Sequence, residues 1–448
     1  MNVPSSSSQS SKEGEDGQHN ETHNAQNEAP GDEQNTSMPR SRKVIICRSK
    51  VDSTPPVPSL TALGLDLEYS LVTCIFCHPS RSPRFKKFCC CAFEPNPLEP
   101  KKTTSVAAAC GGEYVSLVCC ALGKIVGQKK VPGEDLRALA WTTVKLQNGE
   151  NLNILATGGD GMIVGLFHSY YLINYDYLRG HSFGITCLTF HPHKPTILFS
   201  GDRQGYILVW DINVPSQDTC YHYLLMRLKC PCPNFYPVLG LVFMPIHDSL
   251  LATCGDGIFA WTLSDFRPIF QDDKKPLESL QIKIPTKRGP WFDGLARLSD
   301  DLVVVNSIEE GATYVFNFSQ VISSLKNSTI ESMTVEVLGK LRWLETEDVY
   351  VNIRARPGLG AVVSANNKGN IWMYDLQQYA LNRGRYSKFD VMPIKKIELK
   401  NSEFPTTSRH DTRSKRGVVT SIDINSNGKY LVLVTDGGYV CMRKLRNG

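Results

Sequence analysis

The sequence predicts an all-β protein, a seven-bladed β-propeller with a disordered N-terminal tail, and three observations support this prediction. Apolar residues come in short runs or alternations, such as Tyr206-Ile-Leu-Val-Trp210 and Tyr430-Leu-Val-Leu-Val434, and many of them adjoin turn residues. Few long stretches lack Gly or Pro, which leaves little room for helices. A sequence motif recurs along the chain: a glycine turn followed by a strand that ends in an aromatic residue.

The expected organisation is an acidic tail over residues 1–43, a linker over 44–68 and the propeller over 69–448. The first 43 residues contain no Leu, Ile, Phe, Trp or Tyr, so burial cannot offset the entropy of ordering them. Pro55-Pro56-x-Pro58 indicates an extended linker. The same composition offers no apolar segment for a secretory signal peptide, which favours cytosol or nucleus, with the 15 cysteines as thiols or metal ligands.

The repeated motif occurs seven times, and the turn glycines of successive copies are 46 to 68 residues apart. The shortest spacing matches a propeller blade of about 40–45 residues, and the excess indicates loop insertions. Because the seventh copy ends near the C-terminus, the stretch from Tyr69 to Phe76 is expected to complete that blade and close the ring. The turn glycines are Gly111, Gly159, Gly205, Gly257, Gly311, Gly369 and Gly437.

The third copy carries the full signature of a WD40 blade. Gly180-His181 opens it, His191-Pro192 follows its first strand, and Trp210-Asp211 ends it. His181 is therefore expected to form hydrogen bonds within its own blade. The residues assigned to blade structure are His181, Trp210, Asp211, Trp261, Trp372 and Asp375.

Two sequence patterns suggest chemistry of another kind. Gly180-His-Ser-Phe-Gly184 matches a hydrolase nucleophile elbow, but that elbow needs a helix directly after it, and a β-rich stretch follows here. Cys74-Ile-Phe-Cys77-His78 matches a haem attachment pattern, which would imply export.

A zinc site stays open as an alternative. Cys74 and Cys77 precede Cys89-Cys90-Cys91 by little more than ten residues, and Cys230-Pro-Cys232 is a further pair. The first two sets fall in apolar strands, which favours buried thiols. We predict no enzyme activity, catalytic residue, metal, cofactor or small-molecule substrate. No run approaches 18 apolar residues, so no membrane helix is expected either.

The net charge divides unevenly along the chain. Residues 1–40 sum to −5, whereas residues 41–448 carry 47 basic and 37 acidic side chains, a balance of +10. A basic folded part is compatible with chromatin. The basic loop Arg413-Ser-Lys415-Arg416 either adds a salt-sensitive contact or is a solvated connection.

Several strings resemble the WD40 half of the family of leucine-rich repeat and WD repeat-containing proteins, and the resemblance spans roughly residues 70 to 446. A more distant similarity, through Ala140-Trp-Thr142 and the region from Val337 to Tyr350, is to the embryonic ectoderm development family of Polycomb subunits. The family's leucine-rich repeats have no counterpart beyond the short stretch from Leu60 to Leu67. The matching strings are Cys91-Ala-Phe-Glu-Pro95, Ala109-Cys-Gly-Gly-Glu113, Pro132-Gly-Glu-Asp135, Ala140-Trp-Thr142, Trp210-Asp-Ile-Asn-Val-Pro-Ser-Gln-Asp218, Phe292-Asp-Gly-Leu-Ala296 and Gly369-Asn-Ile-Trp-Met-Tyr-Asp375.

The resemblance implies a nuclear, chromosome-associated protein without catalytic activity. It would bind the origin recognition complex, stabilise it on chromatin or heterochromatin, and recognise trimethyl-lysine marks on histone H3 or H4 tails through an aromatic cage. A Polycomb subunit, or a WD40 adaptor in another pathway, remains an alternative.

Transferred position by position, the family's cage matches this sequence in part. Cys89, with Phe88 beside it, stands where the relatives have an aromatic residue, and Arg137 stands at a second such position. Only Tyr350 fits. A cation at Arg137 would repel trimethyl-lysine, so the resemblance predicts a degraded cage and attachment to chromatin mainly through protein partners.

Overall fold

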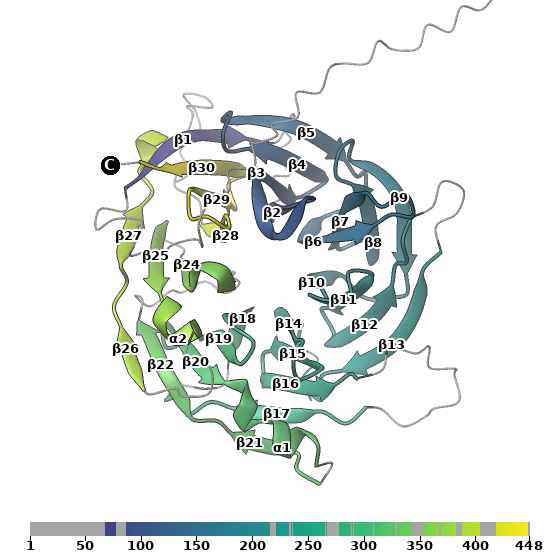
Figure 1. Ribbon diagram of the computed structural model, residues 1–448, viewed down its shortest axis with the longest axis vertical. Helices are drawn as coiled ribbons and strands as arrows, with labels where there is room; N and C mark the ends of the chain where they lie inside the picture. Colours follow the sequence, from purple (N-terminus) through teal and green to yellow (C-terminus); the bar gives the residue numbers. More distant parts are fainter. Residues whose placement is uncertain are drawn as a thin grey trace, which may run out of the picture. The chain divides into compact units, whose positions relative to one another are not determined.

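Seven β-sheets stand radially around a central axis and form a closed ring (Figure 1). This computed structural model confirms the predicted all-β, seven-bladed propeller. The predicted tail, and all of the linker except residue 68, lie outside the residues that the structure describes. The described residues are 68–77, 87–215, 221–232, 234, 236–264, 266, 277–287, 289, 291–307, 309–327, 329–342, 353–366, 369–381, 388–403 and 418–446.

Blades 1 to 3 each contain four antiparallel strands, which follow one another from the axis outward. Blade 1 comprises β2 (Phe88–Asn96), β3 (Glu99–Gly111), β4 (Tyr114–Cys119) and β5 (Lys124–Lys130). Blade 2 comprises β6 (Leu136–Lys145), β7 (Asn151–Gly159), β8 (Ile163–His168) and β9 (Ile173–Arg179). Blade 3 comprises β10 (Ile185–Phe190), β11 (Ile197–Asp202), β12 (Tyr206–Asp211) and β13 (Tyr223–Lys229).

Blades 4 and 5 each gain a fifth, outermost strand that pairs in parallel. Blade 4 comprises β14 (Gly240–Met244), β15 (Ser249–Cys254), β16 (Gly257–Thr262), β17 (Leu280–Lys283) and β21 (Ser332–Thr334). Blade 5 comprises β18 (Phe292–Arg297), β19 (Leu302–Ser307), β20 (Ala312–Asn317), β22 (Val337–Arg342) and β26 (Phe389–Val391).

Blades 6 and 7 return to four strands, and blade 7 takes its outermost strand from the other end of the chain. Blade 6 comprises β23 (Arg354–Arg356), β24 (Ala361–Ala365), β25 (Asn370–Asp375) and β27 (Lys395–Glu398). Blade 7 comprises β28 (Val419–Ile424), β29 (Tyr430–Thr435), β30 (Tyr439–Leu445) and β1 (Tyr69–Phe76).

Helices in the described part of the chain are short. They are α1 (Ile322–Leu325), α2 (Gln377–Leu381) and the 3₁₀ turns η2 (Phe318–Gln320), η3 (Pro357–Leu359) and η4 (Asn401–Glu403). Among the described residues, the structure holds no helix of the length and apolar character needed to span a membrane.

The core is divided among the gaps between neighbouring blades. Seven clusters of buried apolar side chains fill the seven gaps, from blades 1 and 2 around to blades 7 and 1. In the last gap, Phe88 and Phe93 of β2 pack with Val432 and Met442 of blade 7. Apolar burial is the main favourable term in folding, so each blade is stabilised by both of its neighbours.

Ring closure joins the two ends of the propeller as predicted. The strand β1 pairs antiparallel with β30, from Tyr69 opposite Leu445 to Phe76 opposite Tyr439. The Tyr69 hydroxyl also donates to the carbonyl of Gly428 in blade 7. The outer edge of β30 is therefore covered by a strand that lies more than 350 residues away in sequence.

We predict that removing residues 1–76 prevents formation of a folded monomer. The deletion uncovers β30 and removes Tyr69 from the gap between blades 6 and 7, where it packs. Loss of one closing strand also exposes an edge that favours aggregation. The expected result is the absence of a cooperative thermal transition by circular dichroism and elution in the void volume on gel filtration.

The matched control is removal of residues 1–60, which keeps β1 intact. This shorter deletion is expected to retain a cooperative transition within about 2 °C of the full chain. Two deletions that behave alike would show that ring closure does not limit stability.

Candidate functional site

The seven inner strands all begin at the same end of the ring as the glycine turns. Antiparallel register places the start of β2 beside Gly111 and the start of β6 beside Gly159. The backbones approach closely there: a Cβ atom added to Gly159 would lie 2.1 Å from the carbonyl oxygen of Asp135. We call this end of the propeller the turn face, and it contains two of the predicted cage positions.

Arg137, near the start of β6, lies in an ion-pair network on the turn face. Its Nε atom is 2.7 Å from Oδ1 of Asp160, and its guanidinium also contacts Asp135 at 3.4 Å. Asp160 in turn binds Arg203 of blade 3 at 2.6 Å. Partial burial works against the charge, but the two arginines still hold the pKa of Asp160 below its usual range. Arg137 is therefore a paired cation, and Asp160 ties blade 2 to blade 3 through Arg203.

The other cage positions fall in different environments. Cys89 lies close enough to Arg137 to feel its charge, yet burial raises the pKa of the Cys89 thiol to about 12. Phe88 is fully buried between blades 7 and 1, so its ring faces the core rather than the turn face. Tyr350 and the basic loop residues Arg413, Lys415 and Arg416 lie outside the described residues.

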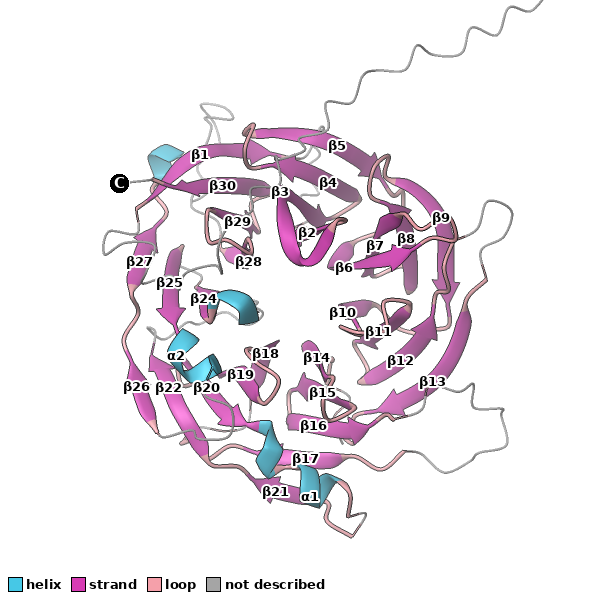
Figure 2. Ribbon diagram, viewed as in Figure 1, coloured by secondary structure: helices cyan, strands magenta, loops and turns pink. Residues whose placement is uncertain are grey.

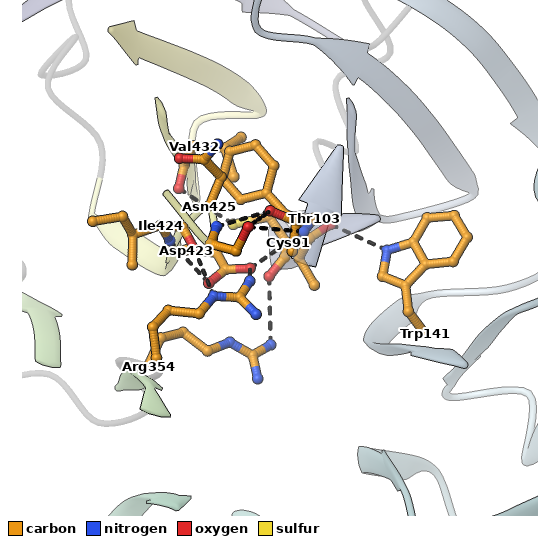
Figure 3. Close-up of polar contacts among 12 residues, drawn as sticks. Cys91, Thr103, Trp141, Arg354, Asp423, Ile424, Asn425 and Val432 are labelled. Atoms are coloured by element: carbon orange, nitrogen blue, oxygen red, sulfur yellow. Dashed lines mark hydrogen bonds and ion pairs between the residues drawn. The ribbon is translucent and has the colours of Figure 1, made fainter. Parts of the chain in front are cut away.

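The inner edge of blade 1 is held by side chains from other blades (Figure 3). As the strand nearest the axis, β2 pairs with no other described strand on that side. Its Phe93 N–H donates to Asp423 of blade 7 at 2.9 Å, and its Ala92 carbonyl accepts from the Trp141 indole of blade 2 at 3.1 Å. Buried backbone groups need such partners, and here side chains supply them.

Two arginines of β23 reach the same region from blade 6. Arg356 binds the Asp423 carboxylate at 2.5 Å and the Ile424 carbonyl at 2.6 Å. Arg354 extends further and contacts the Cys91 carbonyl of blade 1 at 3.4 Å (Figure 3). Side chains from blades 6 and 7 thus converge on blade 1 at the axis.

A buried polar network organises blade 3. His181 places Nδ1 at 3.0 Å from Asp202 and Nε2 at 2.7 Å from the hydroxyl of Ser200. The Trp210 indole donates to the same hydroxyl at 2.8 Å. The order Asp, His, Ser imitates a hydrolytic triad, but Ser200 is fully buried and a substrate could not reach it.

The elbow-like stretch follows the prediction from sequence. After Gly184 the chain continues directly into β10 rather than into a helix. A cavity of about 110 Å³ lies beside this stretch and is lined in part by His181, Phe183 and Tyr206.

The remaining residues assigned to blade structure occupy buried strands or turns. Trp261 and Trp372 are buried in β16 and β25. Asp211 and Asp375 each follow the aromatic end of a third strand and accept a backbone N–H two residues later, from Asn213 at 2.9 Å and Gln377 at 3.0 Å. Both aspartates thus turn the chain out of the blade.

The cysteine patterns lie on strands. Cys74 is on β1, where its sulfur contacts that of Cys441 on β30 at 2.6 Å, and Cys89 to Cys91 are on β2. His78 lies outside the described residues. Within the ranges that the structure describes, no group of three or more His, Cys, Asp or Glu side chains is placed to hold a metal ion.

Blade 5 presents a separate charged cluster at its glycine turn. The Lys340 ammonium lies 2.6 Å from the Glu310 carboxylate, which also accepts from the Tyr314 hydroxyl and the Lys287 backbone N–H. Desolvation opposes the charge on Glu310, yet these donors lower its pKa from 4.5 to about 2.

The contacts at the axis and the partners of Arg137 could not be predicted from the sequence. Arg354 and Cys91 are 263 residues apart, so no local pattern connects them. The sequence offers one sign of the contacts at the axis. Arg354 and Arg356 stand two positions apart, so in a strand both side chains lie on the same face.

Comparison with protein families and solved structures gives a consistent picture. A family model, the WD domain of leucine-rich repeat and WD repeat-containing protein 1, matches residues 62–445. The Xenopus laevis protein of that name is 27% identical over 377 residues, which cover 80% of this chain and 50% of that protein. The Danio rerio protein is 29% identical over 375 residues, with 79% and 47% covered. This chain therefore spans about half the length of the curated relatives it matches.

Solved structures support the fold. A chain of the Chaetomium thermophilum Polycomb Repressive Complex 2 bound to GSK126 superposes with a TM-score of 0.61 at 15% identity, over 84% of this chain and 98% of that chain. The WD40 β-propeller domain of Doa1 gives 0.53 at 13% identity, over 84% and 97%. At such identities the likeness concerns the fold alone.

We predict that His181→Ala destabilises the protein. The substitution leaves the Asp202 carboxylate and the Ser200 hydroxyl without their imidazole partner, and a buried polar group left unsatisfied costs about 1–3 kcal/mol. Urea unfolding should show this loss, whereas His193→Ala, at an exposed position of the same blade, should change stability by less than about 0.5 kcal/mol. Equal effects of the two substitutions would contradict a structural role for His181.

We predict that Glu310 makes stability depend on pH in the acid range. Its pKa is lower in the folded protein than the ordinary 4.5, so its contribution is complete above about pH 4.5 and is lost as pH falls toward 2. The melting temperature of Glu310→Gln should therefore decline less steeply over this range than that of the unaltered protein. Glu331→Gln, at an exposed site, should leave the slope unchanged, and a slope unaffected by Glu310→Gln would refute the assignment.

Proposed function

The chain belongs to the family defined by the WD domain of leucine-rich repeat and WD repeat-containing protein 1, and on this premise we propose that it is a non-catalytic scaffold on chromatin. Specifically, it binds the origin recognition complex and stabilises it on chromatin in the nucleus. The observation that carries the proposal is the continuous family match over residues 62–445, which includes all seven blades and the turn face.

The chemistry of the described surface suits a scaffold. The Ser, His and Asp constellation of blade 3 is sealed inside that blade, and Trp210 shares its serine. On the turn face, Arg137 and Asp160 are committed to each other and to the joint between blades 2 and 3. A rigid ring with fixed charges offers partners a constant surface, and that is what a scaffold requires.

The positive net charge of residues 41–448 is compatible with attachment to chromatin. Residues 41–448 carry a balance of +10, which would strengthen attachment to nucleic acid or acidic partners at low salt. We propose that Arg413, Lys415 and Arg416 add to this term and that protein partners supply most of the affinity.

Recognition of trimethyl-lysine is the weaker part of the inherited role. A cage attracts a quaternary ammonium ion through aromatic rings, each favourable contact contributing about 0.5–2 kcal/mol. Phe88 is turned into the core, Cys89 has no ring, and Arg137 is a cation held in place by Asp160. We propose that histone H3 or H4 tails bind this protein weakly and without strong dependence on methylation.

The first test is co-purification of the tagged full chain from nuclear extract. Subunits of the origin recognition complex are the expected partners, and they should elute from chromatin together with the protein. Recovery of Polycomb methyltransferase subunits would favour a Polycomb role instead. Exclusively cytoplasmic protein at every cell-cycle stage, extracted without chromatin, would refute the proposal in favour of an adaptor in another pathway.

The second test is a titration with histone peptides that are unmethylated or trimethylated at one lysine. We predict a methyl-dependent gain below about tenfold, or 1.4 kcal/mol, because two of three ring positions lack an exposed aromatic side chain. The variant Tyr350→Ala should change binding little. A gain above tenfold that Tyr350→Ala abolishes would show that a functional cage exists.

A further inference from the structure

We propose that Cys74 and Cys441 form a redox modification site, at which a peroxide converts the two thiols into a disulfide that locks the propeller ring closed. The proposal goes beyond the scaffold role proposed above and does not depend on which complex the protein joins. It rests on the position of the two cysteines in the closing strand pair, on the contact between their sulfur atoms and on the partial exposure of one of them.

The two cysteines face each other across the strand pair that closes the propeller. In the register of β1 and β30, Cys74 stands directly opposite Cys441. These two strands lie side by side in blade 7, although they come from opposite ends of the propeller sequence (Figure 2). The two sulfur atoms are 2.6 Å apart, whereas the residues are 367 positions apart in the chain. A bond between them would therefore join the two ends of the ring.

The backbone register at this pair suits a disulfide. The Cys77 N–H donates to the Gly438 carbonyl at 3.1 Å, which makes Cys77 and Gly438 a hydrogen-bonded pair. Pairs of the two kinds alternate along antiparallel strands, so Cys74 and Cys441, three positions away, form a non-hydrogen-bonded pair. The Cα atoms of such pairs are about 4.5 Å apart, and disulfides need a separation of about 4.4–6.8 Å. The strands can therefore stay paired when the bond forms.

Other cysteines near these strands are worse placed. Cys77 follows Cys74 closely in sequence, but three residues of extended chain span about 10 Å, which is too far for a disulfide. Cys90 and Cys110 also stand opposite each other, on β2 and β3, but they are only 5% and 0% exposed, so an oxidant does not reach them. Cys74, in contrast, is partly exposed on the outermost strand of its blade.

The reaction takes two steps and consumes one peroxide. Hydrogen peroxide first oxidises the Cys74 thiol to a sulfenic acid and is itself reduced to water. The Cys441 sulfur then attacks the Cys74 sulfur: the S–S bond forms, the S–O bond of the sulfenic acid breaks, and the leaving hydroxide departs with the Cys441 proton as a second water. The contact with Cys74 and burial raise the pKa of the Cys441 thiol well above its usual range, so the first oxidation falls on Cys74. A small dithiol reverses the modification by exchange.

The bond would stabilise the closed ring. In the reduced protein, β1 is held by its pairing with β30 and by the packing of side chains such as Tyr69 between blades 6 and 7. A disulfide stabilises mainly by restricting the unfolded chain, and this effect grows with the length of the loop that it closes. Because the loop between Cys74 and Cys441 contains nearly the whole propeller, oxidation should oppose the release of β1 strongly.

The experiment treats the reduced full-length protein with hydrogen peroxide, blocks the remaining thiols with N-ethylmaleimide and digests the product with chymotrypsin without reduction. Cleavage after Phe76 separates Cys74 from Cys77, so mass spectrometry identifies which of the two is linked. The expected product is a Cys74–Cys441 linkage. The midpoint of thermal unfolding should rise by about 4 °C or more on oxidation and return after treatment with dithiothreitol.

Three variants separate this disulfide from other oxidation. Cys74→Ser and Cys441→Ala should lose both the linkage and the rise in the thermal midpoint, whereas the matched control Cys77→Ala should retain both. Thermal melts under reducing conditions establish that the variants fold, and the linkage in the unaltered chain is measured without any variant. Conversion of Cys74 to a sulfinic acid without a linkage, a bridge from Cys74 to another cysteine, or a rise in the midpoint that persists in Cys74→Ser would overturn the proposal.

Discussion

The unpaired inner edge of each blade is the constraint on which this structure depends. A radial sheet must end somewhere near the axis, and its last strand leaves backbone groups without a further strand to bond. In blade 1 those groups are bonded by Asp423, Trp141 and Arg354, which come from blades 7, 2 and 6. Blade 1 is therefore completed at the axis only when blades 2, 6 and 7 are in place, which favours stability of the closed ring as a whole.

The same dependence explains why closure matters more than any single hairpin. The pairing of β1 with β30 brings blade 7 against blade 1, and only then can Asp423 of β28 reach the Phe93 backbone. Arg356 of blade 6 neutralises that aspartate at 2.5 Å, so a buried carboxylate is paired as well as hydrogen bonded. Closure thus links the inner strands of blades 1, 6 and 7 through one network of side chains.

The sequence could predict whatever depends on local spacing. Glycine turns recur because the second strand approaches the start of the inner strand so closely that Gly159 has no room for a side chain, and Gly180-His181 with Trp210-Asp211 marked the hydrogen-bonded blade. Contacts between blades were beyond reach because no local pattern joins their partners, which are 43 residues apart for Arg203 and Asp160 and 263 for Arg354 and Cys91. Phe88 illustrates the limit: it was a candidate ring by its position beside Cys89, but strand alternation turns it into the core.

Two faces of the propeller thus differ in what they can offer a partner. On the turn face, the Asp160 carboxylate is paired with both Arg137 and Arg203, so a charged ligand there would have to compete with existing ion pairs. On the rim, by contrast, Tyr171 and Tyr221 keep more than 60% of their surface exposed, and no ion pair has to be broken to bury them. Association gains most where apolar surface and unsatisfied hydrogen-bonding groups are removed from water together. Burial of these exposed rings therefore favours a partner on the rim more than the rearrangement of existing ion pairs would on the turn face.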